Sequence, residues 1–125
     1  MSTNTIIGRL GNERGQRAEL RVEIAVREAF EKETLPSWII GYQRACHEDD
    51  EKGIDGWLDT DVGRIKIQVK SSYAGAREFS RRHQPDIAII IVRNNKISPE
   101  QILDLLIQAV TPLRRRYLEI RQNDW

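Results

Sequence analysis

The sequence contains very few of the residues that stabilise small domains through disulfides or zinc. Among its 125 residues there is one cysteine, Cys46, and there are two histidines, His47 and His83. One cysteine cannot form an internal disulfide, and these three side chains are too few for a four-ligand structural zinc site. A lone cysteine is typical of a reducing compartment, so we expect a cytoplasmic protein.

Long apolar runs are missing too. No apolar stretch approaches the roughly 20 residues that span a bilayer, and the mean hydropathy is −0.56. The segment Met1–Gly11 lacks the basic-then-apolar pattern of a secretory signal. We therefore expect no membrane partner.

A strong charge of one sign is the third absence. The formal net charge is +1, so bulk electrostatic attraction is not the basis of any binding to nucleic acid. The charges are nevertheless unevenly spread, with acidic residues at 48–51 and arginines at 77–82 and Arg114–Arg116. Taken alone, each arginine cluster is expected to be a solvated helix face, although the planar fork of arginine also suits phosphate.

The order of predicted elements indicates one α/β domain over residues 1–125. Helices are expected over about Gly15–Glu33, over Tyr73–His83 and from Ser98 onward, and strands over Ser37–Cys46, Ile54–Asp59, Arg64–Ser71 and Ile87–Val92. The order of helix, three strands, helix, strand and helix predicts a mixed sheet with helices on both of its faces.

Local signals support the first part of this assignment. Pro36 marks the end of the first helix, and residues 60–63 predict a hairpin turn. Ile87–Val92 is almost purely apolar and β-branched, which is typical of a central strand buried on both faces. The apolar stripe expected on the first helix consists of Leu20, Val22, Ile24, Val26, Ala29 and Phe30.

The last helix has a clear start signal. Ser98-Pro99-Glu100-Gln101 combines an N-cap serine, a proline at the first helical position and a capping-box glutamine. Pro112 is expected to interrupt or kink this helix. Its apolar side is expected to consist of Ile102, Leu103, Leu105, Leu106 and Val110.

Two segments carry the residues that favour chemistry, Gly53-Ile54-Asp55-Gly56-Trp57 and Ile67-Gln68-Val69-Lys70-Ser71-Ser72. Gln68 and Lys70 are two apart, so they project from one face of a strand, and pairing of adjacent strands would bring Asp55 beside them. A carboxylate, an amide oxygen and an ammonium group then form a site for a hard cation, with a basic group next to it. Two structural alternatives remain: a solvent-facing polar strand face, and a turn role for Asp55.

This arrangement resembles the PD-(D/E)XK nuclease superfamily, which includes restriction endonucleases and Holliday junction resolvases, and within it a group of largely uncharacterised prokaryotic nuclease-like domains. The resemblance covers about Gly15–Val92 and implies a restriction endonuclease-like αβββαβ core with an extra C-terminal helix. It implies that Asp55 and Gln68 are ligands of Mg²⁺, with Mn²⁺ as a substitute, and that Lys70 is the catalytic lysine. Glu19 on the first helix is the natural third ligand and Glu23 competes with it, the alternative being surface glutamates paired with Arg27 or Arg17.

The sequence departs from the family pattern in two places. Gln68 stands where an acidic ligand is usual, which removes one negative charge and should weaken metal binding. Ile54 stands where the family name has proline. The literal Pro85-Asp86 dipeptide is a decoy, since no acidic ligand follows the strand that it opens.

The resemblance implies a metal-dependent DNA endonuclease, a phosphodiester hydrolase that works as a homodimer without a small-molecule cofactor. By position, Ser72 and Tyr73 either cap the next helix or contact the scissile phosphate, and Arg77, Arg81 and Arg82 lie where a phosphate backbone would have to pass and are candidates to bind it. Two other functions remain open. One is a nucleic-acid-binding module that kept the fold and lost the chemistry, and the other is an assembly subunit that dimerises through Ile102–Val110.

Overall fold

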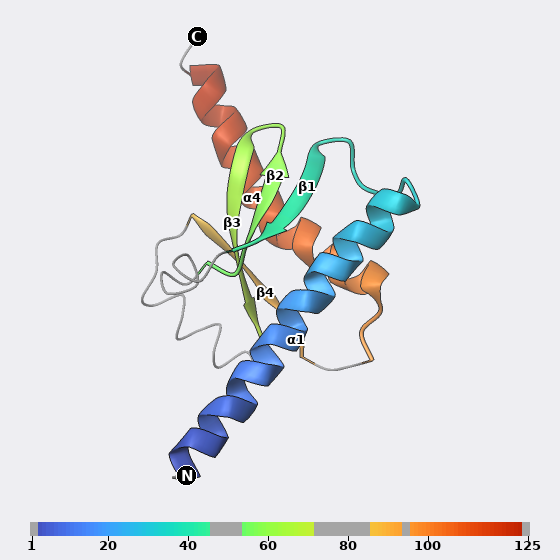
Figure 1. Cartoon of the computed structure of the whole chain (residues 1–125). Helices are drawn as coiled ribbons and strands as arrows, with labels where there is room; N and C mark the ends of the chain where they lie inside the picture. The colour runs from blue at the N-terminus through green and yellow to red at the C-terminus, as the bar shows by residue number, and fades with distance from the viewer. Residues whose placement is uncertain (1–2, 46–53, 72–85, 94–95, 124–125) are drawn as a thin grey trace.

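The computed structural model describes residues 3–45, 54–71, 86–93 and 96–123. Along the chain these form α1 (Thr3–Glu31), β1 (Ile39–Arg44), β2 (Gly56–Thr60), β3 (Gly63–Lys70), β4 (Ile87–Ile91) and α4 (Pro99–Asn123) (Figure 1). The predicted α/β class is confirmed. Of the predicted elements, the helix Tyr73–His83 lies outside the described residues.

The four strands form one mixed sheet in the order β1-β2-β3-β4. β1 pairs with β2 and β2 with β3 in antiparallel fashion, whereas β3 and β4 are parallel. A two-residue turn joins β2 to β3, as the sequence predicts, and Gly63 takes a φ of 110° there, which a residue with a side chain rarely adopts. The Thr60 hydroxyl donates to the Gly63 carbonyl (2.7 Å) and accepts from the Val62 N–H (3.2 Å), so two local hydrogen bonds stabilise the turn.

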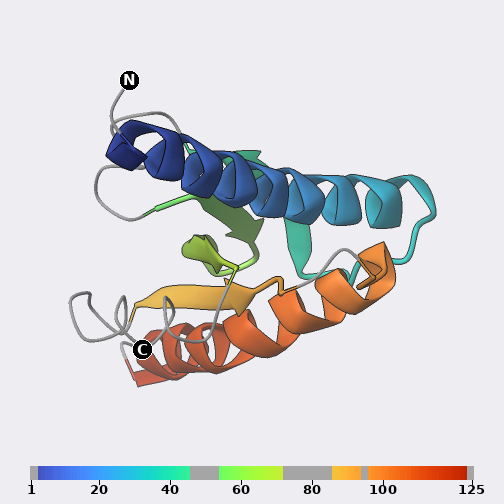
Figure 2. The same cartoon turned by 90° about the horizontal axis from the view of Figure 1, so that it is seen from below.

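The core lies on one face of this sheet. On β3 the apolar set Ile65, Ile67 and Val69 is buried, as the alternation predicts, and both described helices contribute buried side chains to the same cluster. In Figure 2, β4 lies next to α4, and α1 and α4, which cross at an angle in Figure 1, contact each other. Side chains of both described helices thus join one core cluster, and the helix expected over Tyr73–His83, which bears on the prediction of helices on both faces, lies outside the described residues.

Within the described sheet, the assignment of Ile87–Val92 as a central strand is wrong. β4 is an edge strand of the described sheet, and only Ala88, Ile90 and Val92 are buried, while Ile87 and its i+2 neighbours are half-buried. An apolar, β-branched run therefore does not distinguish a strand that is buried on both faces from one that is buried on one face and partly exposed on the other.

α1 is longer at its start than predicted and differs in its buried face. Val22, Val26 and Ala29 are buried as expected, but Leu20 and Phe30 are 44% and 66% exposed. Leu20 lies two residues from Val22, which on a helix is nearly the opposite side. Two alanines that the predicted stripe omitted, Ala18 and Ala25, are buried instead, and their small size lets another element approach closely.

The end of α1 is set by a turn ahead of Pro36. The helix ends at Glu31, Glu33 adopts a left-handed φ of 59°, and the Thr34 N–H donates to the Ala29 carbonyl (2.8 Å). This is a C-terminal cap in which the left-handed conformation of Glu33 turns the chain so that the Thr34 N–H can bond to the Ala29 carbonyl.

α4 begins as predicted and continues further than predicted. The Ser98 N–H donates to Gln101 Oε1 (2.8 Å) and the Gln101 N–H donates to Ser98 Oγ (3.2 Å), a reciprocal capping box. Of the two effects expected at Pro112, an interruption or a kink, the interruption does not occur, because the helix runs through the proline to Asn123. Buried side chains on both sides of the proline, including Val110 and Leu113, hold the helix against the core.

The arginine cluster on α4 is only partly a solvated face. Arg114 donates two hydrogen bonds to the Asp61 carboxylate (2.9 and 2.7 Å) and lies 4.8 Å from the ring centroid of Trp38. Arg115 and Arg116 are exposed, as expected. Arg114 therefore ties α4 to the β2–β3 turn. Neither described helix combines the length and apolar character of a membrane span.

Candidate active site

Asp55 lies one residue before β2 and is held to both neighbouring strands. Its N–H donates to the Ile67 carbonyl (2.9 Å) and its carbonyl accepts from the Ala45 N–H (2.9 Å). Its carboxylate is buried and accepts from the Val69 N–H at 2.7 Å. The two contacts with β3 fall on either side of Gln68, so the structure brings Asp55 next to the segment that carries Gln68.

Gln68 is buried, at 5% exposure, although it belongs to the polar set of β3. Among the described residues its Oε1 has no hydrogen-bond partner. Leaving a buried acceptor unsatisfied costs about 1–3 kcal/mol. This position is therefore not part of a solvent-facing strand surface, and an unpartnered buried oxygen is one that an ion or a bound water would satisfy.

The two lysines that flank Gln68 have different surroundings. Lys66 forms an ion pair with Asp86 (3.0 Å), which gives the acidic residue of the decoy dipeptide a structural role. Lys70 is the last residue of β3 and is half-buried. By strand alternation Lys70 shares the face of Gln68, so an ammonium group lies at the same end of the sheet as Asp55.

Tyr42 on β1 is a member of this region that sequence reasoning missed. Its pairing partner on β2 is Leu58, which lies two residues after Gly56 and on the same face of the strand. A Cβ placed on Gly56 would collide with the phenol ring and its oxygen, so the ring lies directly across this glycine. The Tyr42 hydroxyl is buried without a hydrogen-bond partner among the described residues. The second glycine of the Gly-Ile-Asp-Gly segment was the signal that another group approaches the backbone here.

Burial and negative charge both act on the phenol of Tyr42. Burial raises the pKa of the Tyr42 phenol well above its usual value of 10.0, and the negative charges of Asp55 and Glu19 raise this pKa further. Arg44 acts in the opposite direction, and Glu23 adds a smaller effect of the same sign as the other two acids. The phenol therefore stays protonated and can act as a hydrogen-bond donor.

Glu19 and Glu23 of α1 both face Arg44 of β1. Arg44 approaches Glu19 at 3.5 Å and Glu23 at 3.7 Å, and Glu23 also pairs with Arg27 at 3.1 Å. The pairing predicted as the surface alternative is thus present for Glu23, whereas Glu19, with a side chain 18% exposed, contacts Arg44 instead. α1 presents Glu19 toward the sheet at Tyr42, and Arg44 balances its charge.

The oxygen donors in this region suit a hard cation but do not form an all-acid cage. Within the described ranges, no three side chains of the His, Cys, Asp and Glu types are grouped as a metal site. The pair that fits is the carboxylate of Asp55 with the amide oxygen of Gln68, and Mg²⁺ commonly uses one or two carboxylates and several waters.

Comparison with known proteins finds no matching family model, no similar curated sequence and no similar solved structure. The residues predicted to bind nucleic acid, Ser72, Tyr73, Arg77, Arg81 and Arg82, lie outside the described residues.

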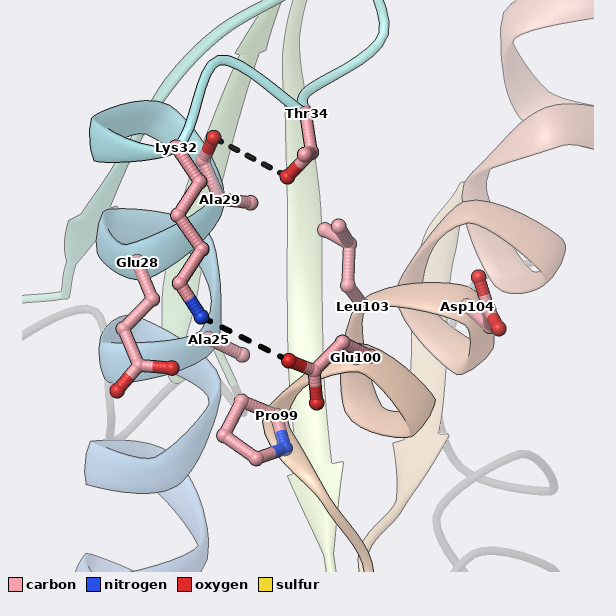
Figure 3. A pocket seen from close by; sticks show the side chains of 9 residues that line it. All are labelled: Ala25, Glu28, Ala29, Lys32, Thr34, Pro99, Glu100, Leu103 and Asp104. Carbon is pink, nitrogen blue, oxygen red and sulfur yellow. Dashed lines mark hydrogen bonds and ion pairs between the residues drawn. The ribbon is translucent and has the colours of Figure 1, made fainter.

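A pocket of about 270 Å³ lies elsewhere, between the second half of α1 and the first turns of α4 (Figure 3). Ala29 and Leu103 contribute apolar surface, and Glu28 and Glu100 contribute carboxylates. Lys32 reaches toward Glu100 at 3.8 Å, as Figure 3 shows. None of the described candidate site residues lines this pocket, so it is separate from the region around Asp55.

Proposed function

We propose that this chain is a metal-dependent nuclease that hydrolyses phosphodiester bonds, with DNA as its substrate and a homodimer as its working form. The observation that carries the proposal is the buried Oε1 of Gln68, which has no hydrogen-bond partner among the described residues, next to the anchored carboxylate of Asp55. A polar group in a core without a protein partner favours a functional explanation over a structural one.

Asp55 and Gln68 are the residues that would hold the ion. Asp55 is fixed by backbone contacts on both sides, so little ordering is needed when the ion binds. When bound, Mg²⁺ polarises a phosphoryl oxygen and lowers the pKa of a bound water. Glu19, on α1, adds negative charge to the same region without belonging to a cluster of three acids.

Lys70 supplies the basic group of the proposed site. Its side chain comes from the end of β3, two residues beyond Gln68 and on the same face. An ammonium group in this place can position an attacking water or stabilise the charge that develops on the phosphate. The proposal assigns this role to Lys70, and Lys66, the other lysine on this strand face, forms an ion pair with Asp86.

One observation favours a second function. An amide in place of an acidic ligand lowers the charge of the site, and the net charge of the chain is only +1. Both are compatible with a nucleic-acid-binding module that has lost catalysis. Such a module would bind DNA without a divalent cation, whereas the proposed nuclease needs one.

The test is a cleavage assay with supercoiled plasmid and single-stranded DNA in Mg²⁺, Mn²⁺ or EDTA. We expect metal-dependent cutting by the wild type and a loss of at least 100-fold in Lys70→Ala, a typical effect of removing one stabilising group. Lys66→Ala is the matched control, because it removes a lysine from the same strand face. Equal activity of Lys70→Ala and wild type would refute the assignment, and DNA binding without any cutting would favour the binding module.

A further inference from the structure

We propose that Arg44 and a divalent cation compete for the Glu19 carboxylate, so that Arg44 limits the affinity of the candidate metal site. The inference rests on the proposed function, because it concerns the ion that Asp55 and Gln68 would hold. It goes beyond that function by assigning a role to an arginine of β1 and by making Glu19 available to the ion only when Arg44 releases it.

Arg44 lies at the end of the sheet that carries Asp55. It pairs with Gly56, the residue that follows Asp55, and the N–H of the next residue, Ala45, donates to the Asp55 carbonyl (2.9 Å). α1 packs on β1 and β3, the two strands on either side of β2, and the Arg44 side chain reaches from β1 to Glu19 on that helix. The Glu19 carboxylate is therefore separated by one arginine side chain from the strand end at Asp55.

Two carboxylates share Arg44, and neither holds it closely. The guanidinium approaches Glu19 at 3.5 Å and Glu23 at 3.7 Å. Charge-assisted hydrogen bonds between a guanidinium and a carboxylate measure about 2.7–2.9 Å, and the pair of Arg114 with Asp61, at 2.7 Å, has that length. Because its contacts are longer than this, Arg44 can leave one of the two acids at a small cost.

The unequal burial of the partners favours an exchange of cations at Glu19. The side chain of Glu19 is 18% exposed, whereas that of Arg44 is 42% exposed. A carboxylate that is mostly buried is costly without a cation beside it, but a long arginine can turn its charged head group toward water. A divalent cation that takes over Glu19 therefore leaves Arg44 with solvent and Glu23, and Glu19 keeps a counter-charge throughout.

The experiment measures Mn²⁺ affinity by isothermal titration calorimetry at about 0.15 M salt, which weakens the effect of charges that are not in contact. We expect Arg44→Gln to lower the Kd about fivefold, which corresponds to about 1 kcal/mol, the upper value for one ion pair between partly exposed side chains. In a Glu19→Gln background the same change should leave the Kd as it is, because no carboxylate is left to be released there. Arg27→Gln is the matched control and should bind as wild type does, since Arg27 pairs with Glu23 at 3.1 Å.

Thermal unfolding supplies a second measurement. Without metal, Arg44→Gln should lower Tm, because Glu19 loses the cation that lies 3.5 Å from it. Saturating Mn²⁺ should then raise the Tm of this variant more than that of wild type, since the ion binds the variant more tightly. Arg44→Lys keeps the positive charge without the planar fork, so its Kd should lie between those of wild type and Arg44→Gln.

The outcomes separate this inference from the proposed function. An unchanged or higher Kd in Arg44→Gln, with a wild type that binds Mn²⁺ and cuts DNA, would overturn the role of Arg44 and leave the nuclease function standing. An equal gain in affinity in the Glu19→Gln background would overturn the competition for Glu19. If Arg44→Gln does not fold, Arg44→Lys decides, because a Kd equal to that of wild type would overturn the inference. A wild type that neither binds Mn²⁺ nor cuts DNA would overturn the nuclease function as well.

Discussion

Replacing Gln68 by methionine should stabilise the protein while it removes metal binding. Methionine is similar to glutamine in length and volume, and it fills irregular apolar space well. The substitution deletes a buried oxygen that has no hydrogen-bond partner among the described residues. A side chain kept at a cost to stability is a mark of a functional site.

The size of the effect follows from two opposing contributions. Removing an unsatisfied buried acceptor gains about 1–3 kcal/mol. Losing the hydrogen bond that the amide nitrogen makes to protein or water offsets about 0.5–1.5 kcal/mol of this gain. The net expectation is a stabilisation of about 1 kcal/mol, which for a chain of this size raises Tm by roughly 3–6 °C.

The assay is thermal unfolding with and without Mn²⁺, together with Gln68→Glu as the matched variant. In the absence of metal, glutamate should lower Tm, because it buries a second carboxylate near Asp55. Added Mn²⁺ should raise the Tm of Gln68→Glu most, that of wild type less, and that of Gln68→Met not at all. A Tm of Gln68→Met below that of wild type would refute the reasoning, since the amide oxygen would then have a stabilising partner.

Two further predictions concern the frame around the site. Asp61→Asn should destabilise the protein at neutral pH, because the Arg114 hydrogen bonds hold the pKa of Asp61 below its usual value of 3.8. A depressed carboxyl pKa stabilises the fold at pH values above the unfolded-state pKa, and this stabilisation is lost as the pH falls through the folded-state pKa. The free energies of unfolding of variant and wild type, measured with urea, should therefore converge in strong acid, and a difference that persists there would contradict this origin. Ser98→Ala should lower the free energy of unfolding by about 1 kcal/mol, as measured by urea denaturation, because the Gln101 N–H loses its cap; an equal loss in Ser98→Thr would show that the hydroxyl is not the cause.

Local patterns predicted the parts of the fold that local physics determines. The capping box at Ser98 and Gln101 formed as expected, because both partners lie within one turn of chain. The two-residue turn before Gly63 and the alternation along β3 were likewise predicted, since strand pairing and pleat depend on near neighbours. These features need no knowledge of the rest of the molecule.

Features that depend on tertiary contacts were predicted poorly. Phe30 is apolar at a helical spacing and is nevertheless exposed, because the helix with which α1 packs reaches its alanine-lined side. Pro112 does not end α4, since packing on both sides of it compensates for one missing hydrogen bond. The edge position of β4 also depends on which strands pair, and its composition carries no information on that.

The candidate site shows the same division. The approach of Asp55 to the segment that carries Gln68 and Lys70 could be predicted, because Asp55 directly precedes a strand that pairs with β3. Tyr42 could not be, because its approach to Gly56 results from the pairing of β1 with β2. The role of Arg44 in holding Glu19 depends on how α1 crosses the sheet, which the sequence does not state.

The charge of this neighbourhood gives a physical reason for glutamine at position 68. Asp55, Glu19 and Glu23 already act on the Tyr42 phenol, and Arg44 is the cation that opposes them there. A further acid at a 5% exposed position would bury another negative charge before any ion is bound, at a cost that a neutral amide avoids. Glutamine keeps an oxygen for the ion without that cost. The neighbouring acids then supply the negative charge that the amide lacks, so an amide at this position is compatible with binding of a divalent cation.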